Sequence, residues 1–419
     1  MNMKKIISLF LALIMLLALC ACKADWSASQ EPSAEPEAVE TAAPSPTSEP
    51  EPPAEPLDFS AAFAAYDPEE TVFYVDGSSV TWRELFYEIV YVSSAIAARE
   101  GKAITSWDAP CALFTNAQGE AYPYGEVVLQ NAIAFLEQYH IVENRLAEAG
   151  VTLGEDELAA VAAMRQQAID ESFGGDEAAF EAYLASMFCT EELWNWFNQV
   201  DVAYNLGFVA FYGEMGCDYP DEAVLEYANG DEGGLWTEYV QLKMIGLPAE
   251  EEPAAPEETA EPEETASQEA SAEPAEEELT LAETILAELN KAEDKDEAFA
   301  RLFDQYNEEA GLAYFPDGWC VYQGDTAEEI YQAALNMDDY DCCAVSLDDA
   351  AVIVMKVPLQ PDGAVKYDVS TDTCYTLRYF AAMQDYATLV NGEDGWIAQG
   401  SADASWAPGF EGFTLASVF

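Results

Sequence analysis

The chain has 419 residues, with 15 Lys and Arg against 80 Asp and Glu, and its formal net charge is −65. So few basic residues offer no positive surface for phosphates, which excludes a nucleic-acid-binding protein. A single histidine excludes a multi-histidine metal site and most histidine-dependent triads. Hydrophobic residues make up 50% of the chain, so it can still build large cores, and its length is typical of about two domains.

The first residues have the pattern of a lipoprotein signal peptide. Lys4 and Lys5 precede the apolar run Ile6–Leu19, which has the length of a signal peptide and is short for a membrane span. The run ends in Leu19-Cys20-Ala21-Cys22, which resembles a bacterial lipobox and implies cleavage after residue 21 and a lipid on Cys22. A simple secretory signal and an uncleaved anchor are the alternatives. The lipid would hold the protein at the extracytoplasmic face of the membrane.

Two segments have a composition that does not fold. Residues 22–57 are dominated by Ala, Pro, Ser and Glu, and residues 249–278 repeat this composition without a single Lys or Arg. Such stretches cannot bury enough apolar surface to offset the entropy of ordering them. We therefore predict a disordered tether at 22–57 and a disordered acidic insertion at 249–278. The remaining chain is also acidic, which favours solubility or an attraction for basic partners.

Seven cysteines follow Cys22, and none belongs to a CxxC pair: Cys111, Cys189, Cys217, Cys320, Cys342, Cys343 and Cys374. Unpaired thiols in a secreted protein indicate an anaerobic source, whereas up to three disulfides and one free thiol are the alternative. Most of these cysteines lie in apolar runs, which is typical of small buried side chains.

The first folded region opens with a strand, a tight turn, a second strand and a capped helix. Residues 72–75 favour a strand, Asp76-Gly77 is a turn signal, and residues 78–80 lead out of it. Thr81 and Glu84 have the spacing of a capping box. Apolar residues follow at a helical spacing that predicts one buried face: Leu85, Ile89, Val92 and Ile96.

This opening, VFYVDGSSVTWRELF at residues 72–86, resembles the start of the chaperone domain in SurA/PrsA-type extracytoplasmic foldases. After a helix predicted over 125–149, the segment AGVTLGEDEL at residues 149–158 resembles a later helix junction of that family. Further similar pieces follow in order at Gly174-Gly175-Asp176, at residues 190–193 and in a short helix at 221–227. No piece is specific alone, but their order and spacing together indicate the family.

The second half resembles a parvulin-type prolyl isomerase domain. Its first strand is predicted at residues 238–245. The segment FARLFDQYNEEAGL at residues 299–312 resembles a parvulin helix and the loop that follows it. Helices are predicted at 279–290, 296–306 and 327–335, and a last strand at 350–357. The predicted order is β-α-α-β-α-β-β, with residues 249–278 looped out at little cost in closure entropy. A helix at 371–390 and extended segments at 396–397 and 413–419 close the chain.

The predicted fold class is therefore α+β, a mainly helical SurA-N-like chaperone domain with an inserted parvulin-like domain. The domain ranges are a signal peptide at 1–21, the tether at 22–57, a helical domain at 58–236 completed by 366–419, and a parvulin-like domain at 237–358. The resemblance implies that the C-terminal segment returns to the helical domain. It covers roughly residues 70–419.

The resemblance also implies a site, in which two histidines and a thiol or acid line an apolar pocket for proline. At these positions stand Lys243 (or Met244, if the register shifts) and the pair Val352-Ile353, so both histidines are missing. Glu308 and Glu309 fall at the acid position and are the candidates for residual catalysis, and the pocket positions hold Thr326 and Ile330. We expect a degenerate isomerase fold, with weak isomerase activity as the alternative.

The remaining candidates concern binding. His140 lies in a predicted helix and is expected in a core or on a surface. An aromatic set at helical spacing is typical of a core but could bind clients if exposed: Trp194, Trp196, Phe197 and Phe208.

We therefore predict a lipid-anchored folding factor that binds unfolded or newly secreted polypeptides, without cofactor, metal or nucleic acid. The alternative is a solute-binding lipoprotein of a transporter, although the two lobes of alternating strands and helices which that class needs are not found. A hydrolase has no support, because the chain contains neither GxSxG nor HExxH.

Overall fold

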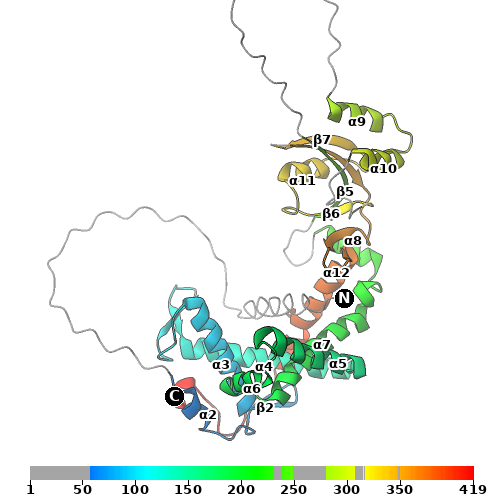
Figure 1. Cartoon of the computed structure of the whole chain (residues 1–419). Coiled ribbons are helices and arrows are strands. Elements are labelled where there is room, and N and C mark those ends of the chain that lie inside the picture. The colour runs from blue at the N-terminus through cyan, green and yellow to red at the C-terminus, as the bar shows by residue number, and fades with distance from the viewer. Residues whose placement is uncertain (1–56, 231–237, 249–279, 307–314, 316, 348–349) are drawn as a thin grey trace, which may run out of the picture. The chain divides into compact units, whose positions relative to one another are not determined.

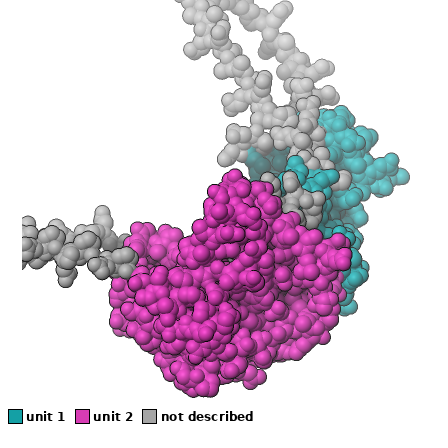
Figure 2. Space-filling model, turned by 60° about the horizontal axis from the view of Figure 1, so that its bottom comes forward, with its two compact units in different colours: residues 1, 211–385 teal, residues 2–210, 386–419 magenta. Residues whose placement is uncertain are grey.

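The computed structural model describes residues 57–230, 238–248, 280–306, 315, 317–347 and 350–419. Their fold is α+β, as predicted. They divide into two compact units: unit 2 takes in the described residues up to Ala210 and those from Tyr386 to Phe419, and unit 1 takes in those from Phe211 to Asp385 (Figure 2). The division falls inside two helices, α7 (Glu191–Tyr212) and α12 (Leu377–Asn391). The predicted domain ranges stay a prediction, since their boundary at 236–237 lies in the undescribed segment 231–237.

Unit 2 is built mainly from helices (Figure 1). Besides its parts of α7 and α12, its elements in chain order are α2 (Phe59–Phe63), β1 (Thr71–Val75), β2 (Ser78–Thr81), α3 (Trp82–Glu100), β3 (Pro110–Thr115), β4 (Ala121–Pro123), α4 (Tyr124–Glu148), α5 (Glu155–Ser172), α6 (Glu177–Ser186), α13 (Trp396–Ser401), β11 (Ser405–Trp406) and the 3-10 helix η3 (Leu415–Ser417).

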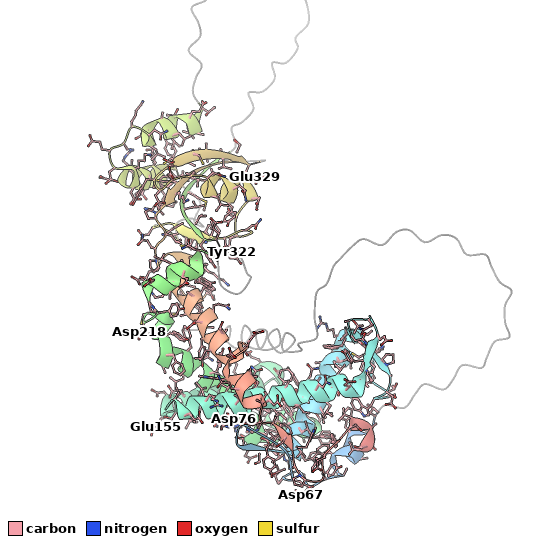
Figure 3. The ribbon with its side chains drawn as sticks, turned by 180° about the vertical axis from the view of Figure 1, so that it is seen from behind. Asp67, Asp76, Glu155, Asp218, Tyr322 and Glu329 are labelled. Carbon is pink, nitrogen blue, oxygen red and sulfur yellow. The ribbon has the colours of Figure 1, made fainter. Side chains whose placement is uncertain are left out.

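Local signals set the start of unit 2. Asp76 (φ 47°) and Gly77 (φ 84°) both adopt positive φ, which the two-residue hairpin between β1 and β2 requires. The Glu84 N–H donates to the Thr81 hydroxyl (3.3 Å), and the Thr81 N–H donates to the Glu84 carboxylate (2.6 Å). The predicted capping box at the start of α3 is therefore confirmed. Asp76 is labelled in Figure 3, and its carboxylate lies 2.8 Å from the Arg145 guanidinium of α4.

The buried face of α3 is the predicted one. Leu85 and Ile89 are fully enclosed, and Val92 and Ile96 are almost so. They belong to one core together with residues of α4 such as Val128 and with the N-terminal strands. The apolar face of α3 thus packs against α4, as expected of an amphipathic helix.

The last residues of the chain lie in the same core. Phe73 of β1 pairs with Trp406 of β11 in the three-stranded sheet β11-β1-β2, and Phe410, Phe413 and Leu415 are buried beside it. The side chain of Tyr386 in α12 is also wholly buried, and its hydroxyl donates to the Tyr204 carbonyl of α7 (2.9 Å). Unit 2 is therefore a core made from two distant parts of the sequence.

Unit 1 contains a six-stranded sheet with helices. Besides its parts of α7 and α12, its elements are the 3-10 helix η1 (Glu214–Gly216), α8 (Asp221–Ala228), β5 (Val240–Pro248), α9 (Leu281–Leu289), α10 (Lys295–Tyr306), β6 (Trp319–Val321), α11 (Glu328–Leu335), β7 (Cys342–Leu347), β8 (Ala350–Val357), β9 (Ala364–Asp368) and β10 (Thr373–Thr376). The order from β5 to β8 is β-α-α-β-α-β-β, so this prediction is confirmed.

The six strands lie in the order β10-β9-β6-β5-β8-β7, antiparallel except for the pair β6 and β9. Because side chains alternate along a strand, β5 sends Val240, Leu242 and Met244 to one face and Ile245 and Leu247 to the other. The first face packs against α11, and the second packs against α9 and α10 (Figure 1).

Arg378 in α12 ties several elements of unit 1 together. Its guanidinium donates to the Tyr219 carbonyl, to Asp221 at the start of α8 (2.6 Å) and to Asp362 before β9 (2.7 Å). Hydrogen bonds with Asp362 outweigh the effect of desolvation and raise the pKa of Arg378. Short polar contacts thus hold α8, α12 and the β8–β9 connection in one arrangement.

Three predictions of secondary structure are wrong near the C-terminus. The helix predicted over 371–390 begins only at Leu377, because residues 373–376 pair with β9 as strand β10. Residues 396–397 were predicted extended but open helix α13, where Gly400 packs directly against Ile141 of α4. Residues 413–419 were also predicted extended and contain η3. In each case a long-range contact overrides a weak local preference.

The cysteines are less buried than the sequence indicates. All seven of those in the described residues are unpaired, and only Cys111, Cys189 and Cys320 are buried. Cys342 and Cys343 are half-buried, whereas two are exposed: Cys217 and Cys374. Cys217 lies in a turn and Cys374 lies on the edge strand β10, and neither stands in an apolar run of the sequence.

Candidate functional site

The predicted pocket positions of unit 1 lie on opposite faces of the six-stranded sheet. Lys243 of β5 stands on the face covered by α9 and α10, where its Nζ is 2.7 Å from Asp296 Oδ1 of α10. Ile330 of α11 is 4% exposed and packs on the other face. Thr326, just before α11, is half-buried. The structure therefore does not bring Lys243 together with Ile330.

Met244, the neighbour of Lys243, lies on the α11 face instead. There it belongs to one cluster with Ile330, Val321 of β6 and Val354 of β8, and Val352 packs against them. Ile353 points to the other face, among α9 and α10. Three side chains of this cluster carry a polar group. The Tyr331 phenol donates to the Glu238 carbonyl (2.7 Å), the Trp319 indole donates to the Val365 carbonyl (2.8 Å), and burial raises the pKa of the Cys343 thiol. This face can therefore pack against an apolar group, and its half-buried thiol is shifted away from ionisation near neutral pH.

Three predicted site residues lie outside the described residues: Cys22, Glu308 and Glu309. Their roles in lipidation and catalysis stay predictions. Figure 3 labels two exposed residues near α11, namely Tyr322 after β6 and Glu329 in the first turn of the helix.

The predicted aromatic set lies along α7 and is largely enclosed. Phe197 and Phe208 are 8% and 7% exposed, and Phe208 packs against Tyr386. Trp194 and Trp196 are half-buried. The burial of the two phenylalanines supports the core interpretation, and a role in client binding stays a prediction.

A chain of ring contacts leads from Trp194 to the surface of unit 2. The Trp194 ring lies 5.7 Å from Phe180 of α6, Phe180 lies 5.6 Å from Phe173, and Phe173 lies 5.5 Å from Tyr183. Tyr183 is 47% exposed, while Phe180 is buried. We call these four residues the α6–α7 aromatic cluster. It offers an exposed aromatic edge supported by a rigid interior, which suits weak contact with apolar chain segments.

The only histidine, His140 of α4, is a core residue. Its Nε2 lies 3.3 Å from Glu84 Oε1, and its ring lies 4.7 Å from that of Trp196. Burial works against the charged form of Glu84, but hydrogen bonds from His140 and Thr81 outweigh this effect and lower the pKa of Glu84. Glu84 thus completes the cap of α3 and also contacts the buried His140. These contacts give His140 a structural role.

Sequence reasoning missed two carboxyl groups in unit 2, the buried Glu88 and the half-buried Asp201. Glu88 of α3 is 4% exposed, and burial raises its pKa to about 8. Burial also raises the pKa of Asp201 in α7 to about 7, although a hydrogen bond from the Tyr139 hydroxyl (3.2 Å) works in the opposite direction. A signal was present for Glu88, because it stands between Leu85 and Ile89 on the buried face of α3. For Asp201 the helical pattern carried no comparable signal.

Neither a metal site nor a membrane-spanning helix is present among the described residues. There, no group of three or more His, Cys, Asp or Glu side chains is arranged to hold a metal ion. Among the same residues, no helix combines the length and the apolar character needed to cross a membrane.

Solved structures that are similar to this chain include two of PrsA. No family model matches the chain, and no curated protein matches it. The crystal structure of PrsA from Bacillus subtilis is 12% identical, with a TM-score of 0.25 over 71% of this chain and 93% of that one. The crystal structure of the foldase protein PrsA from Streptococcus pneumoniae is 14% identical, with a TM-score of 0.27 over 68% of this chain and 91% of that one.

Proposed function

We propose that this protein is an extracytoplasmic folding factor that binds unfolded secreted polypeptides and is anchored by a lipid on Cys22. In this proposal unit 2 is the chaperone part, and unit 1 is a parvulin-like domain that has lost its catalytic histidines. The clients are newly secreted chains, and nucleic acid is not a partner because the net charge of −65 repels it.

One observation carries the proposal: the chain leaves a helical unit at α7, builds a sheet unit in the order β-α-α-β-α-β-β, and returns at α12 to complete the first core. The sequence motifs at residues 72–86 and 149–158 resemble a foldase family with this same interrupted order. Motif order and element order are separate observations, since the motifs are local and the interruption is a property of the whole chain.

The α11 face of the sheet favours binding over isomerisation. Proline isomerisation needs a polar lining that stabilises the twisted amide, and at the two positions where the family has histidine this chain has Lys243 or Met244, and Val352 or Ile353. Lys243 is engaged by Asp296 on the opposite face. Catalysis would therefore depend on Glu308 and Glu309, the remaining candidates for residual isomerase activity.

Client contact would use the exposed edge of the α6–α7 aromatic cluster together with the acidic surface. Tyr183 presents an aromatic ring, and unfolded chains expose apolar segments that such a ring can contact. The excess of acidic residues would attract basic clients from a distance and weaken with salt.

The test uses the soluble form that begins at Lys23, with a client whose refolding is limited by proline isomerisation. We expect the protein to reduce client aggregation while the slow refolding phase keeps its rate. Tyr183→Ser should weaken this protection, whereas Tyr340→Ser in unit 1, a residue of similar exposure (44% against 47%), should not. If aggregation and refolding are both unchanged by the parent protein, the proposal is wrong for general clients.

Three further outcomes separate the alternatives. If the slow phase accelerates in proportion to protein concentration, unit 1 is catalytic, and Glu308→Gln and Glu309→Gln are the first variants to examine. The anchor is tested in the full chain, where Cys22→Ala should move the protein from the membrane fraction to the medium or soluble fraction. The alternative of a solute-binding lipoprotein would show stoichiometric binding of a small ligand, and nothing in the described geometry favours it.

A further inference from the structure

Strand β7 (Cys342–Leu347) is an outermost strand of the six-stranded sheet in unit 1 (Figure 1). It pairs with β8 over its whole length without a register shift. On its other side, no strand pairs with it among the described residues. The strand at the opposite edge, β10, differs, because its register with β9 shifts between Tyr375 and Thr376 and α12 follows it directly. β7 is therefore the regular edge of this sheet.

The outer side of β7 carries backbone groups without partners. The Lys356 N–H of β8 donates to the Asp341 carbonyl (3.1 Å), and the hydrogen bonds between two antiparallel strands fall on alternate residues. The N–H and C=O groups that face away from β8 are therefore those of Cys342, Ala344 and Ser346. Within the described part of the chain, no hydrogen bond reaches them. Such a row of donors and acceptors can pair with a further extended chain.

The side chains of β7 indicate what that chain should carry. Cys343, Val345 and Leu347 belong to the apolar cluster on the α11 face, and only Val345 among them is fully buried. Ala344 and Ser346 alternate with them and are exposed. A neighbouring strand lies about 4.8 Å away, so its residues on the α11 face would extend the apolar cluster. Its residues on the other face would meet small side chains and solvent, so alternating apolar and polar residues fit best.

The charges beside β7 favour a basic partner. Asp338, Asp339 and Asp341 in the turn before the strand are exposed, and no ion pair among the described residues engages them. Lys295 and Lys356 also reach this turn, but their Nζ atoms donate to backbone carbonyls there (2.8 and 2.9 Å). The acids outnumber these lysines, so Lys or Arg residues at the ends of the partner strand would be attracted.

A second copy of this chain fits the same edge poorly. Each copy has a formal net charge of −65 and brings the same acidic turn. Pairing two β7 strands would therefore bring like charges together, which is a way in which proteins prevent association through sheet edges. A basic segment of another polypeptide avoids this repulsion.

We propose that the outer edge of β7 binds an extended polypeptide segment that has alternating apolar and polar residues and basic ends. The segment adds to the sheet as a further strand, and its backbone pairs with Cys342, Ala344 and Ser346. This gives unit 1 a binding role that needs no catalytic histidine. That the natural segment belongs to an unfolded client rests on the proposed function.

The experiment measures binding of the labelled synthetic peptide KKVTVTVTKK to the soluble form that begins at Lys23, by fluorescence anisotropy. The peptide EEVTVTVTEE keeps the alternation and reverses the charge. We expect the basic peptide to bind about tenfold or more tightly than the acidic one, and its affinity to fall as salt is added.

Ala344→Pro tests the backbone pairing. It removes an N–H that faces away from β8 and leaves the bonds to β8, and proline is tolerated on an edge strand at such a position. Binding of the basic peptide should weaken roughly five- to tenfold. The matched control is Val369→Pro in the turn between β9 and β10, where the residue is 67% exposed, and it should bind as the parent does.

The acidic turn is tested by the double variant Asp338→Asn and Asp339→Asn, which should weaken binding of the basic peptide roughly threefold. Its control removes two exposed carboxylates from α5 of unit 2, by Glu155→Gln and Asp156→Asn (Figure 3). This control should leave the affinity unchanged.

Hydrogen exchange in the parent protein decides the question should Ala344→Pro fail to fold. The amides of Cys342, Ala344 and Ser346 should exchange rapidly in the free protein and slowly with the basic peptide bound. The proposal is wrong if the peptide binds without protecting them, or if a folded Ala344→Pro binds like the parent. A dimer of the parent that Ala344→Pro abolishes would assign this edge to a second copy and also overturn the proposal.

These measurements use no client, so the two proposals can fail separately. If the parent protein suppresses client aggregation but does not bind the peptide, the β7 site is wrong and the proposed function stands. If the peptide binds at β7 and client aggregation is unchanged, the site stands and the proposed function is wrong for general clients.

Discussion

Removing the last residues of the chain tests how strongly unit 2 depends on its distant half. A variant that ends at Asp403 loses β11, the partner of β1, and three buried side chains: Phe410, Phe413 and Leu415. Burying one such side chain stabilises a protein by about 1.5–3 kcal/mol. The three together contribute roughly 5–9 kcal/mol, while a whole domain is stable by only about 5–15 kcal/mol.

The contribution of these three side chains is a lower bound on the stability lost, because the C-terminal residues make further ring contacts. The Phe413 ring lies 5.7 Å from Trp82, which is fully buried, and the Phe419 ring lies 5.0 Å from Trp107. Their loss exposes the facing rings as well. We therefore expect unit 2 of the truncated variant to melt roughly 10–35 °C lower or to be unfolded at 25 °C.

The assay is thermal unfolding of the soluble form that begins at Lys23, followed by tryptophan fluorescence and circular dichroism. Phe413→Ala serves as a smaller step, with an expected loss of about 3–5 kcal/mol. Deletion of residues 249–278 serves as the control, since shortening a connection changes closure entropy only slightly. If the truncated variant melts within about 2 °C of the parent, the C-terminal residues do not complete this core, and the reasoning is wrong.

Three further predictions concern single residues. Thr81→Ala removes the cap of α3 and should cost about 1 kcal/mol in the free energy of unfolding, whereas Thr81→Ser should cost less; equal losses by urea denaturation would contradict the cap. Gly207→Ala places a Cβ against Leu146 and the Tyr386 hydroxyl, so overpacking of about 1–3 kcal/mol should exceed the gain of about 1 kcal/mol in helix propensity, and a stabilised variant would refute this packing. Arg378→Lys keeps the charge but not the planar guanidinium that contacts two carboxylates. The free energy of unfolding of unit 1 should fall by about 1–2 kcal/mol, a modest loss because both carboxylate partners are exposed. An unchanged urea midpoint would show that the planar geometry adds nothing.

The sequence predicts some parts of the candidate site and not others. The aromatic spacing on α7 indicated a largely buried face, and Phe197 and Phe208 are buried as that pattern predicts. The sequence could not predict the face of the sheet on which Lys243 lies, because a shift of one residue in strand register moves a side chain to the other face. Lys243 therefore contacts Asp296, while Met244 faces Ile330.

The features that could be predicted from the amino-acid sequence are local ones. The Asp76-Gly77 turn, the capping box of Thr81 and Glu84, and the helical spacing after Leu85 each depend on residues within about one or two turns of chain, and the structure has all of them. The order of elements from β5 to β8 followed in the same way, because each helix or strand carried its own pattern.

Features that join distant residues depend on how the chain folds as a whole. Residues 373–376 form a strand because they pair with β9. β11 pairs with β1, although most of the chain lies between these two strands in the sequence. The burial of Glu88 likewise depends on the elements that pack against α3. Local patterns report the preference of a segment, whereas pairing, burial and pKa depend on which segments finally become neighbours.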